Sequence, residues 1–328
     1  MHALAAPDKF RGSLTAAEVA QALAEGARLA GWSCAELPLA DGGEGTLDAL
    51  GGANRSTRVT GPLGDPVDAG WRLADGVAVI EMARASGLAL TGGAERNDPL
   101  AATTRGTGEL IAAALAAGAG GVIVAVGGSA TTDGGLGAVE ALGGRPFDVP
   151  VQVACDVRTM FRDAAAVFGP QKGATPEQVA RLTDRLDALA ERYRRELGVD
   201  VSALPGAGAA GGLAGGLTAL GATLEPGLAL VAERVGLEGA LAQADLVLTG
   251  EGKLDATSLE GKVVGGVLDA AAARGIAAVV VAGQIVPGTG VPVPAVSLVE
   301  RFGEERAWHD TASCVAEAAE MLTRSARS

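Results

Sequence analysis

The sequence predicts an α/β protein with about two domains. Its short apolar runs lack the polar alternation of half-exposed strands, which is typical of parallel strands covered on both faces. Helical patterns lie between these runs, and strand alternating with helix is the mark of α/β architecture. The length of 328 residues exceeds that of an average single domain and suggests two.

The apolar runs stop at glycines or charged residues. The predicted strands are 3–6, 37–40, 77–80, 122–126, 151–155, 246–248 and 278–282. Carboxylates lie at or just beyond five of these ends, namely Asp8, Asp41, Glu81, Asp156 and Glu251. Ligands of open α/β sheets bind beyond the carboxyl ends of the strands. A single carboxylate there is usually a helix cap, but five around glycine-rich turns favour a binding site.

Two segments carry helix-start signals. Thr15 with Glu18 forms a capping box before an apolar stripe, and Thr175, Pro176 and Gln178 open a second, longer helix. The second stripe recurs every three or four residues up to Leu197, which is typical of a packing helix. A third helical pattern covers residues 110–115.

Composition limits the partners. The net charge is −13 and the sequence pI is about 4.7, so the surface repels nucleic acid and anionic lipid. An anionic substrate would need local compensation from Lys, Arg, backbone N–H groups or a divalent cation. Three isolated cysteines without a CxxC pair argue against a disulfide framework. No signal peptide or apolar run of about 20 residues is evident, so we expect a cytoplasmic protein that contacts neither membrane nor nucleic acid.

Residue types restrict the chemistry. The chain has only His2 and His309, neither in a polar cluster, which disfavours a histidine metal site or a Ser-His-Asp triad. General base work then falls to a carboxylate or a lysine. A Walker A loop is absent. Residues 206–211 match the dinucleotide-binding pattern GxGxxG, but the segment before them is a poor strand. A nicotinamide-dependent dehydrogenase is therefore only a weak alternative. The other interpretation is a glycine-rich turn that opens a helix, and the start of that helix could still hold phosphate.

Two further loops could bind phosphate. The stretch Gly127–Gly135 follows a predicted strand, precedes an apolar helix, and offers backbone N–H groups, hydroxyls and Asp133. That set suits phosphate with Mg²⁺, although Ser, Thr and Asp also cap helices. Lys172 lies between glycines in the loop 168–173, where a lysine is usually solvated.

Eight longer segments of the chain stand out, namely 6–15, 38–46, 59–64, 106–111, 127–135, 166–173, 206–212 and 245–255. Together they resemble the signature segments of the type 1 glycerate kinase family, the bacterial glycerate 2-kinases. The resemblance implies ATP-dependent phosphorylation of D-glycerate with Mg²⁺. It also implies two α/β domains with the active site in the cleft between them: a Rossmann-like domain with a mainly parallel sheet, built from both chain ends, and an inserted domain. We estimate that the Rossmann-like domain covers residues 1–60 and 230–328, and that the inserted domain covers residues 61–229.

The resemblance also suggests roles for individual residues. Catalysis would fall to Lys9, Asp41, Asp133 and Asp156, and the last two would also be the metal ligands. Substrate or phosphate would meet Asp8, Arg11, Ser13, Gly42, Gly43, Glu44, Gly127, Gly128, Ser129, Thr131, Lys172, Glu251 and Lys253.

The chain departs from the family pattern in places. The segments 143–150 and 157–167 are short, which bears on local substrate contacts, and the resemblance is expected to fade beyond Gly283. The family members most like this chain imply phosphorylation at the 2-position. A glycerate 3-kinase, or a kinase of a related hydroxy acid, is the alternative, and the sequence leaves monomer or homodimer open.

Overall fold

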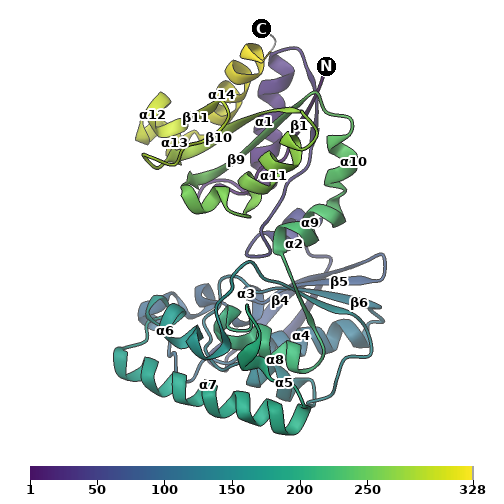
Figure 1. The fold of residues 1–328 in the computed structure, drawn as a ribbon, viewed down its shortest axis with the longest axis vertical. Coiled ribbons are helices and arrows are strands. Elements are labelled where there is room, and N and C mark those ends of the chain that lie inside the picture. Colours follow the sequence, from purple (N-terminus) through teal and green to yellow (C-terminus); the bar gives the residue numbers. More distant parts are fainter. Residues whose placement is uncertain (327–328) are drawn as a thin grey trace. The chain divides into compact units, whose positions relative to one another are not determined.

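The structure, a computed structural model, describes residues 1–326 and divides into two compact units (Figure 1). The first unit contains Met1–Asp41, Asp48–Leu50 and the chain from Leu228 onward, so it is built from both ends of the chain. The second contains Gly42–Leu47 and Gly51–Gly227. The chain enters the second unit before residue 60, because strand β3 (Arg55–Thr60) pairs there with β4 (Pro66–Ala74).

A five-stranded, fully parallel sheet forms the centre of the first unit. Its order is β11 (Ala295–Ser297), β10 (Ala277–Ile285), β9 (Leu246–Leu254), β1 (His2–Ala5) and β2 (Ser33–Glu36). Helices cover both faces. One core contains α1 (Ala16–Leu29) and α14 (Thr311–Ser325); the other contains α9 (Gly227–Val235), α10 (Leu237–Leu241) and α11 (Val263–Ala272). The predicted Rossmann-like architecture is therefore confirmed.

The strand order places a topological switch point between β1 and β9. From β1 the chain runs through α1 on one face to β2, and from β9 it runs through α11 on the opposite face to β10. Neighbouring parallel strands whose crossovers leave in opposite directions open a crevice at their carboxyl ends, where doubly wound proteins bind ligands. The first unit thus has one position where a ligand site is expected from topology alone.

The second unit contains a mixed six-stranded sheet. Its order is β3, β4, β5 (Val77–Glu81), β6 (Gly121–Ala125), β7 (Val151–Ala154) and β8 (Thr223–Glu225). The β3–β4 and β4–β5 pairs are antiparallel, and the remaining pairs are parallel. Its helices are α3 (Ala83–Ser86), α4 (Arg105–Ala116), α5 (Leu136–Ala141), α6 (Ala164–Phe168), α7 (Pro176–Leu197) and α8 (Leu213–Ala219). Short helix α2 (Thr46–Ala49) and helices α12 (Leu298–Phe302) and α13 (Glu304–His309) complete the chain.

Local signals in the sequence identified most of these elements. Both predicted capping boxes are present, at Thr15 and at Thr175, and α7 buries its predicted stripe. The strand expected at 37–40 is wrong: β2 lies at Ser33–Glu36 instead. Pro38 has no N–H to donate, so the chain follows β1 only through the amides of Leu37 and Leu39. The segment 206–211 is the expected glycine-rich turn, which opens α8.

Candidate active site

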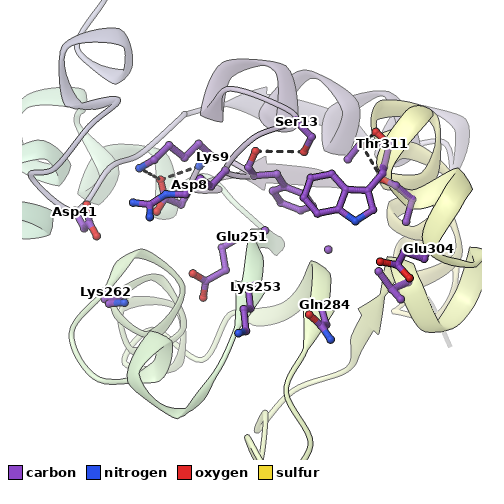
Figure 2. Close-up of a pocket in the computed structure, with 17 residues that line it drawn as sticks. Asp8, Lys9, Ser13, Asp41, Glu251, Lys253, Lys262, Gln284, Glu304 and Thr311 are labelled. Carbon is purple, nitrogen blue, oxygen red and sulfur yellow. Dashed lines mark hydrogen bonds and ion pairs between the residues drawn. The ribbon is translucent and has the colours of Figure 1, made fainter. Parts of the chain in front are cut away.

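A pocket lies at the switch point of the first unit, with a volume of about 590 Å³ (Figure 2). It is lined by the loop after β1, Asp41, the end of β9, Lys262 before α11, the end of β10, and helices α12 to α14. Seven predicted site residues come together here, namely Asp8, Lys9, Arg11, Ser13, Asp41, Glu251 and Lys253. Sequence positions separated by more than 240 residues thus share one site.

Backbone contacts fix the loop after β1. The amide of Asp8 donates to the carbonyl of Gly250 (2.9 Å), and Phe10 pairs with Leu14 to close a tight turn. The Ser13 hydroxyl donates to the carbonyl of Phe10 (3.2 Å). A Cβ on Gly252 would lie 3.0 Å from the amide nitrogen of Arg11, so glycine lets β9 pass directly beneath this turn. The turn directs Lys9 and Arg11 toward the pocket.

Charge in the pocket is balanced although the chain is strongly acidic. Four cationic side chains line it, from Lys9, Arg11, Lys253 and Lys262. Four carboxylates accompany them, from Asp8, Asp41, Glu251 and Glu304. A chain with 26 basic and 39 acidic residues therefore concentrates cations here, as the sequence requires of a site for an anionic substrate.

Burial alters two of these carboxylates. Burial raises the pKa of Asp8, the charge of Lys9 lowers it, and the nearby Asp41 raises it again. Lys9 lies beside Asp8, with Nζ 3.7 Å from Oδ1. Burial raises the pKa of Glu251 to about 7, and its buried Oε1 accepts no hydrogen bond. A carboxylate that titrates near neutrality and has an unused acceptor is suited to bind a cation or a proton.

A second group of predicted site residues lies in the second unit. Gly127 and Gly128 follow β6 and pack against the segment that carries Gly43 and Glu44. A Cβ added to Gly127 would lie 2.7 Å from the Cα of Gly43. A Cβ added to Gly128 would lie 2.5 Å from Oε1 of Glu44. Gly42 is equally confined, since its Cβ would lie 2.8 Å from that of Ala154. These glycines therefore permit close packing of two loops.

Ser129 and Thr131 continue this loop. Ser129 is buried and forms an isolated bridge with Gly87. The hydroxyl of Thr131 is buried without a hydrogen-bond partner. Both side chains are thus enclosed by the second unit.

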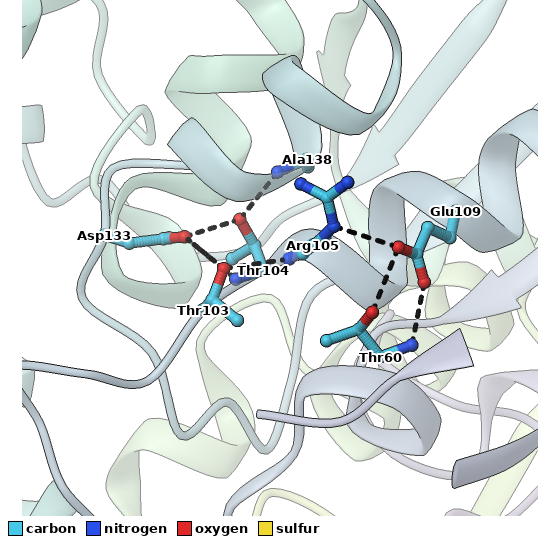
Figure 3. Close-up of polar contacts among 7 residues, drawn as sticks. All are labelled: Thr60, Thr103, Thr104, Arg105, Glu109, Asp133 and Ala138. Atoms are coloured by element: carbon cyan, nitrogen blue, oxygen red, sulfur yellow. Dashed lines mark hydrogen bonds and ion pairs between the residues drawn. The ribbon is translucent and has the colours of Figure 1, made fainter. Parts of the chain in front are cut away.

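Asp133 is buried and accepts hydrogen bonds from several donors (Figure 3). Its Oδ2 receives the amide and the hydroxyl of Thr104, each at 2.8 Å, and the amide of Gly137 at 3.2 Å. Its Oδ1 receives the amide of Gly135 at 3.1 Å. A carboxylate with so many donors has little capacity left for a metal ion, so these contacts favour a structural role over the expected metal or catalytic one.

Lys172 is 2% exposed. Its Nζ donates to the carbonyl of Thr131 (2.6 Å) and lies 5.9 Å from the centre of the Phe168 ring. Burial lowers the pKa of Lys172 to about 7, against the opposing influence of Asp133. The side-chain amide of Asn97 holds the same loop by donating hydrogen bonds to the carbonyls of Ala130 (3.0 Å) and Lys172 (2.9 Å). The structure thus places Lys172 inside the unit, where it secures the 127–135 loop.

The carboxylates of Asp156 and Glu81 accept hydrogen bonds from backbone amides. Asp156 is exposed, and its Oδ1 accepts from the amide of Gly227 (2.7 Å), the first residue of α9. Glu81 is buried and accepts from the amide of Leu47 (2.8 Å) and from Nε of Arg84 (3.1 Å). These contacts match the helix-cap alternative for strand-end carboxylates.

Several lining residues of the pocket went unnoticed in the sequence. They are Lys262, Gln284, Glu304, Trp308 and Thr311. All but Lys262 follow Gly283, beyond the segments that carry the family resemblance. The available signal was Trp308, an indole in the otherwise polar segment Glu304–Asp310.

Neither membrane nor metal sites stand out in the described part of the chain. Within residues 1–326, no helix combines the length and the apolarity needed to cross a membrane. The same residues contain no group of three or more His, Cys, Asp or Glu side chains placed to hold a metal ion.

A doubly wound sheet with a pocket at its switch point is the arrangement in which α/β enzymes bind small ligands. The chain matches the Glycerate kinase family over residues 3–150 and 146–328. It therefore belongs to the glycerate kinase family, and it is a kinase. The match continues past Gly283 to the end of the chain, so the expectation that the resemblance fades there is wrong.

Individual relatives agree with this assignment. The chain is 41% identical to Glycerate 2-kinase of Escherichia coli (strain K12), with 89% of this chain and 87% of that protein aligned. It is 42% identical to Glycerate kinase of Bacillus subtilis (strain 168), with 87% and 85% aligned. A crystal structure from Salmonella typhimurium LT2, of a protein provisionally named glycerate kinase 2, is similar with a TM-score of 0.85 and 38% identity over 100% of this chain and 98% of that one.

Proposed function

We propose that this kinase transfers the γ-phosphate of ATP to the 2-hydroxyl of D-glycerate, giving 2-phospho-D-glycerate and ADP. The observation that carries the proposal is the pocket at the β1–β9 switch point, which gathers four cations in an acidic chain. The name of the Escherichia coli relative, a glycerate 2-kinase, supports the 2-position over the 3-position.

Phosphoryl transfer depends mainly on positioning and on neutralising charge. We assign the phosphates to the four cationic side chains that line the pocket, none of which is fully buried, namely Lys9, Arg11, Lys253 and Lys262. Ser13 and the backbone of the same turn would help to hold the loop in place. Gly127 and Gly128 pack against Gly43 and Glu44 within the second unit, so we assign these glycine-rich segments a structural role.

Asp8 and Asp41 fit a magnesium ion bound together with ATP. Mg²⁺ is usually held by one or two carboxylates plus phosphate oxygens and water. The two carboxylates line one pocket and repel each other, since Asp41 raises the pKa of Asp8. A divalent cation supplies charge neutralisation for the transferred phosphate. This assignment replaces Asp133, both of whose carboxylate oxygens already accept hydrogen bonds, and Asp156, which belongs to the second unit and does not line this pocket.

Glu251 would accept the proton of the attacking hydroxyl. Its pKa near 7 lets it be ionised at neutral pH and still take a proton. Its buried Oε1 has no hydrogen-bond donor within the described chain, so it retains an acceptor for the substrate hydroxyl.

The three cysteines, Cys34, Cys155 and Cys314, are free thiols, which supports the proposal of a cytoplasmic enzyme.

Release of ADP from Mg-ATP should depend on D-glycerate, in a coupled assay that compares D-glycerate, L-glycerate and glycerol. The product can be passed to enolase without phosphoglycerate mutase, since enolase dehydrates only the 2-phosphate. Immediate formation of phosphoenolpyruvate is expected. A product that needs mutase would identify a glycerate 3-kinase, and turnover of glycerol without glycerate would reject the proposal.

A further inference from the structure

Trp308 is a large apolar side chain left open to solvent. It is 55% exposed, whereas Trp32 and Trp71 are 5% and 3% exposed. Exposed indoles are uncommon on a protein surface, and this chain has only 3% aromatic residues. Trp308 lines the pocket at the switch point. Its position therefore calls for a ligand with an apolar face.

The ring is held where a flat ligand could reach it. Trp308 lies on α13, and its backbone carbonyl accepts a hydrogen bond from the Thr311 hydroxyl (3.2 Å). Gly12 has a φ of +86° and passes beside the indole, with the position of a Cβ 3.7 Å from Cζ3. Glycine at this point leaves the loop after β1 close to one side of the ring without covering it.

The pocket has two chemically different ends. Phe10, Val299, Ala307 and Trp308 supply an apolar wall, with Ser13, Gln284, Glu304 and Thr311 as nearby polar groups. At the other end lie Lys9, Lys262, Asp8 and Asp41, with Glu251 and Lys253 along the floor (Figure 2). A ligand that matches both ends carries an aromatic ring at one end and several negative charges at the other.

Size separates the two substrates of the reaction. The pocket of about 590 Å³ is within the range of about 300–1,000 Å³ that is typical of sites for drug-sized ligands. Glycerate is a three-carbon acid without an aromatic face, so it would leave the apolar end unused. A nucleoside triphosphate has both the length and the two chemical ends.

We infer that Trp308 forms the base subsite for the nucleotide, with the adenine stacked on the exposed indole face and the triphosphate directed toward Lys253, Lys9 and Lys262. The inference rests on the proposed function only in taking ATP as the nucleotide. Stacking of a base suits this position because a base can stack on any accessible aromatic face, without specific hydrogen bonds. Glu304 at the same end repels phosphate, which fixes the direction of the nucleotide.

Trp308→Ala should raise the KM for ATP about tenfold or more, the scale of a lost base–aromatic stack. The kcat and the KM for D-glycerate should stay near their wild-type values, and Trp308→Phe should restore most of the ATP affinity. Leu29→Ala is the matched control, because Leu29 is 57% exposed on the same unit and lies outside the pocket. It should change none of these constants.

Fluorescence gives a readout that does not require turnover. Trp308 is the accessible indole, so acrylamide should quench it more than the two buried ones, and the difference between wild type and Trp308→Phe isolates its signal. Adenosine and Mg-ADP should protect it. Tripolyphosphate, which has no base, should bind wild type and Trp308→Ala equally.

Unchanged quenching with adenosine and Mg-ADP, together with an unchanged KM for ATP in Trp308→Ala, would overturn the base subsite. In that case glycerate phosphorylation by wild type would leave the proposed function intact. If wild type did not phosphorylate glycerate, the fluorescence titration with Mg-ADP would still decide the inference.

Discussion

The pocket of the first unit and the Gly127–Gly135 loop of the second unit, together with Lys172 that contacts this loop, contain the same kinds of residue but differ in their environment. Lys9 retains a 20% exposed side chain, whereas Lys172 is 2% exposed and donates to a carbonyl of its own unit. Glu251 has an acceptor oxygen without a donor, whereas Asp133 receives four hydrogen bonds at 2.8 to 3.2 Å. Loops with lysine and acidic residues can therefore either line a pocket or hold the fold together.

Topology explains the difference. The loop after β1 and the end of β9 open at a switch point, where adjacent crossovers leave on opposite faces. In the second unit, the loop after β6 is covered by Gly43 and Glu44 and held from within by Asn97 and Lys172. We therefore expect substitutions in the pocket to affect turnover and substitutions in the loop to affect stability.

The largest effect is expected for Lys9→Ala. Removal of this cation, which we propose meets the transferred phosphate, should lower kcat/KM by about a hundredfold or more. The free energy of unfolding should change by no more than about 1 kcal/mol, because the ion pair between Lys9 and Asp8 is partly exposed to solvent. Arg28→Ala is the control, since Arg28 pairs with Glu36 on the same unit outside the pocket. Near-normal activity with a large stability loss would place Lys9 among the structural residues.

Glu251→Gln tests the proposed base through pH. In wild type, kcat/KM should rise as the pH increases through about 7, because the base must lose its proton. In Glu251→Gln, turnover should fall by about a hundredfold, and that rise should disappear. A variant that kept the wild-type pH profile would remove Glu251 from the reaction.

The same carboxyl group predicts the opposite trend for stability. Its folded pKa of about 7 exceeds the ordinary 4.5, so the folded state binds more protons in that interval. Without nucleotide, wild type should therefore lose stability relative to Glu251→Gln from about pH 4.5 to 7 and level off above, as measured by urea unfolding.

Asp133→Asn should mainly weaken the fold. Its amide group would face donors such as the Gly135 amide and leave buried partners unsatisfied, at a cost of about 1–3 kcal/mol. Turnover per folded molecule should stay close to wild type. Asp187→Asn is a suitable control, because it removes an exposed ion pair on α7. A selective loss of turnover with a raised Mg²⁺ requirement would return Asp133 to the metal site.

Asp156→Asn should have the smallest effect. As a cap on the first residue of α9, it should cost a few tenths to about 1 kcal/mol of stability. Turnover should remain near wild type. A fall of about a hundredfold in kcat, on the scale of a positioned acid or base, would show that Asp156 is catalytic.

The sequence was sufficient for much of the fold, because its signals there are local. Capping boxes at Thr15 and Thr175 depend on neighbouring residues alone, and apolar runs identify parallel strands without knowledge of their partners. The strand expected at 37–40 failed where a local rule was overlooked, since Pro38 lacks the N–H that a paired strand donates.

The site was harder to predict because its residues are assembled by tertiary contacts. Lys9 precedes Gly12 by three residues and Lys172 directly precedes Gly173, and only packing reveals that the first lysine lines a pocket and the second is buried. In the sequence, Trp308 stands out only as an indole among mostly polar residues, whereas its exposure and its place beside Gly12 depend on α13 reaching the loop after β1. Exposure of a side chain is a property of the fold.

Hydrogen exchange of the backbone in the presence and absence of Mg-ADP tests the central claim most directly. We expect the nucleotide to slow exchange most in 8–13, 251–262 and 304–311, which surround the pocket. Exchange in 127–135 should change much less, because that loop is already held by Asp133 and Lys172. The strongest protection at 127–135, with none around the pocket, would contradict the account and place the nucleotide on the second unit.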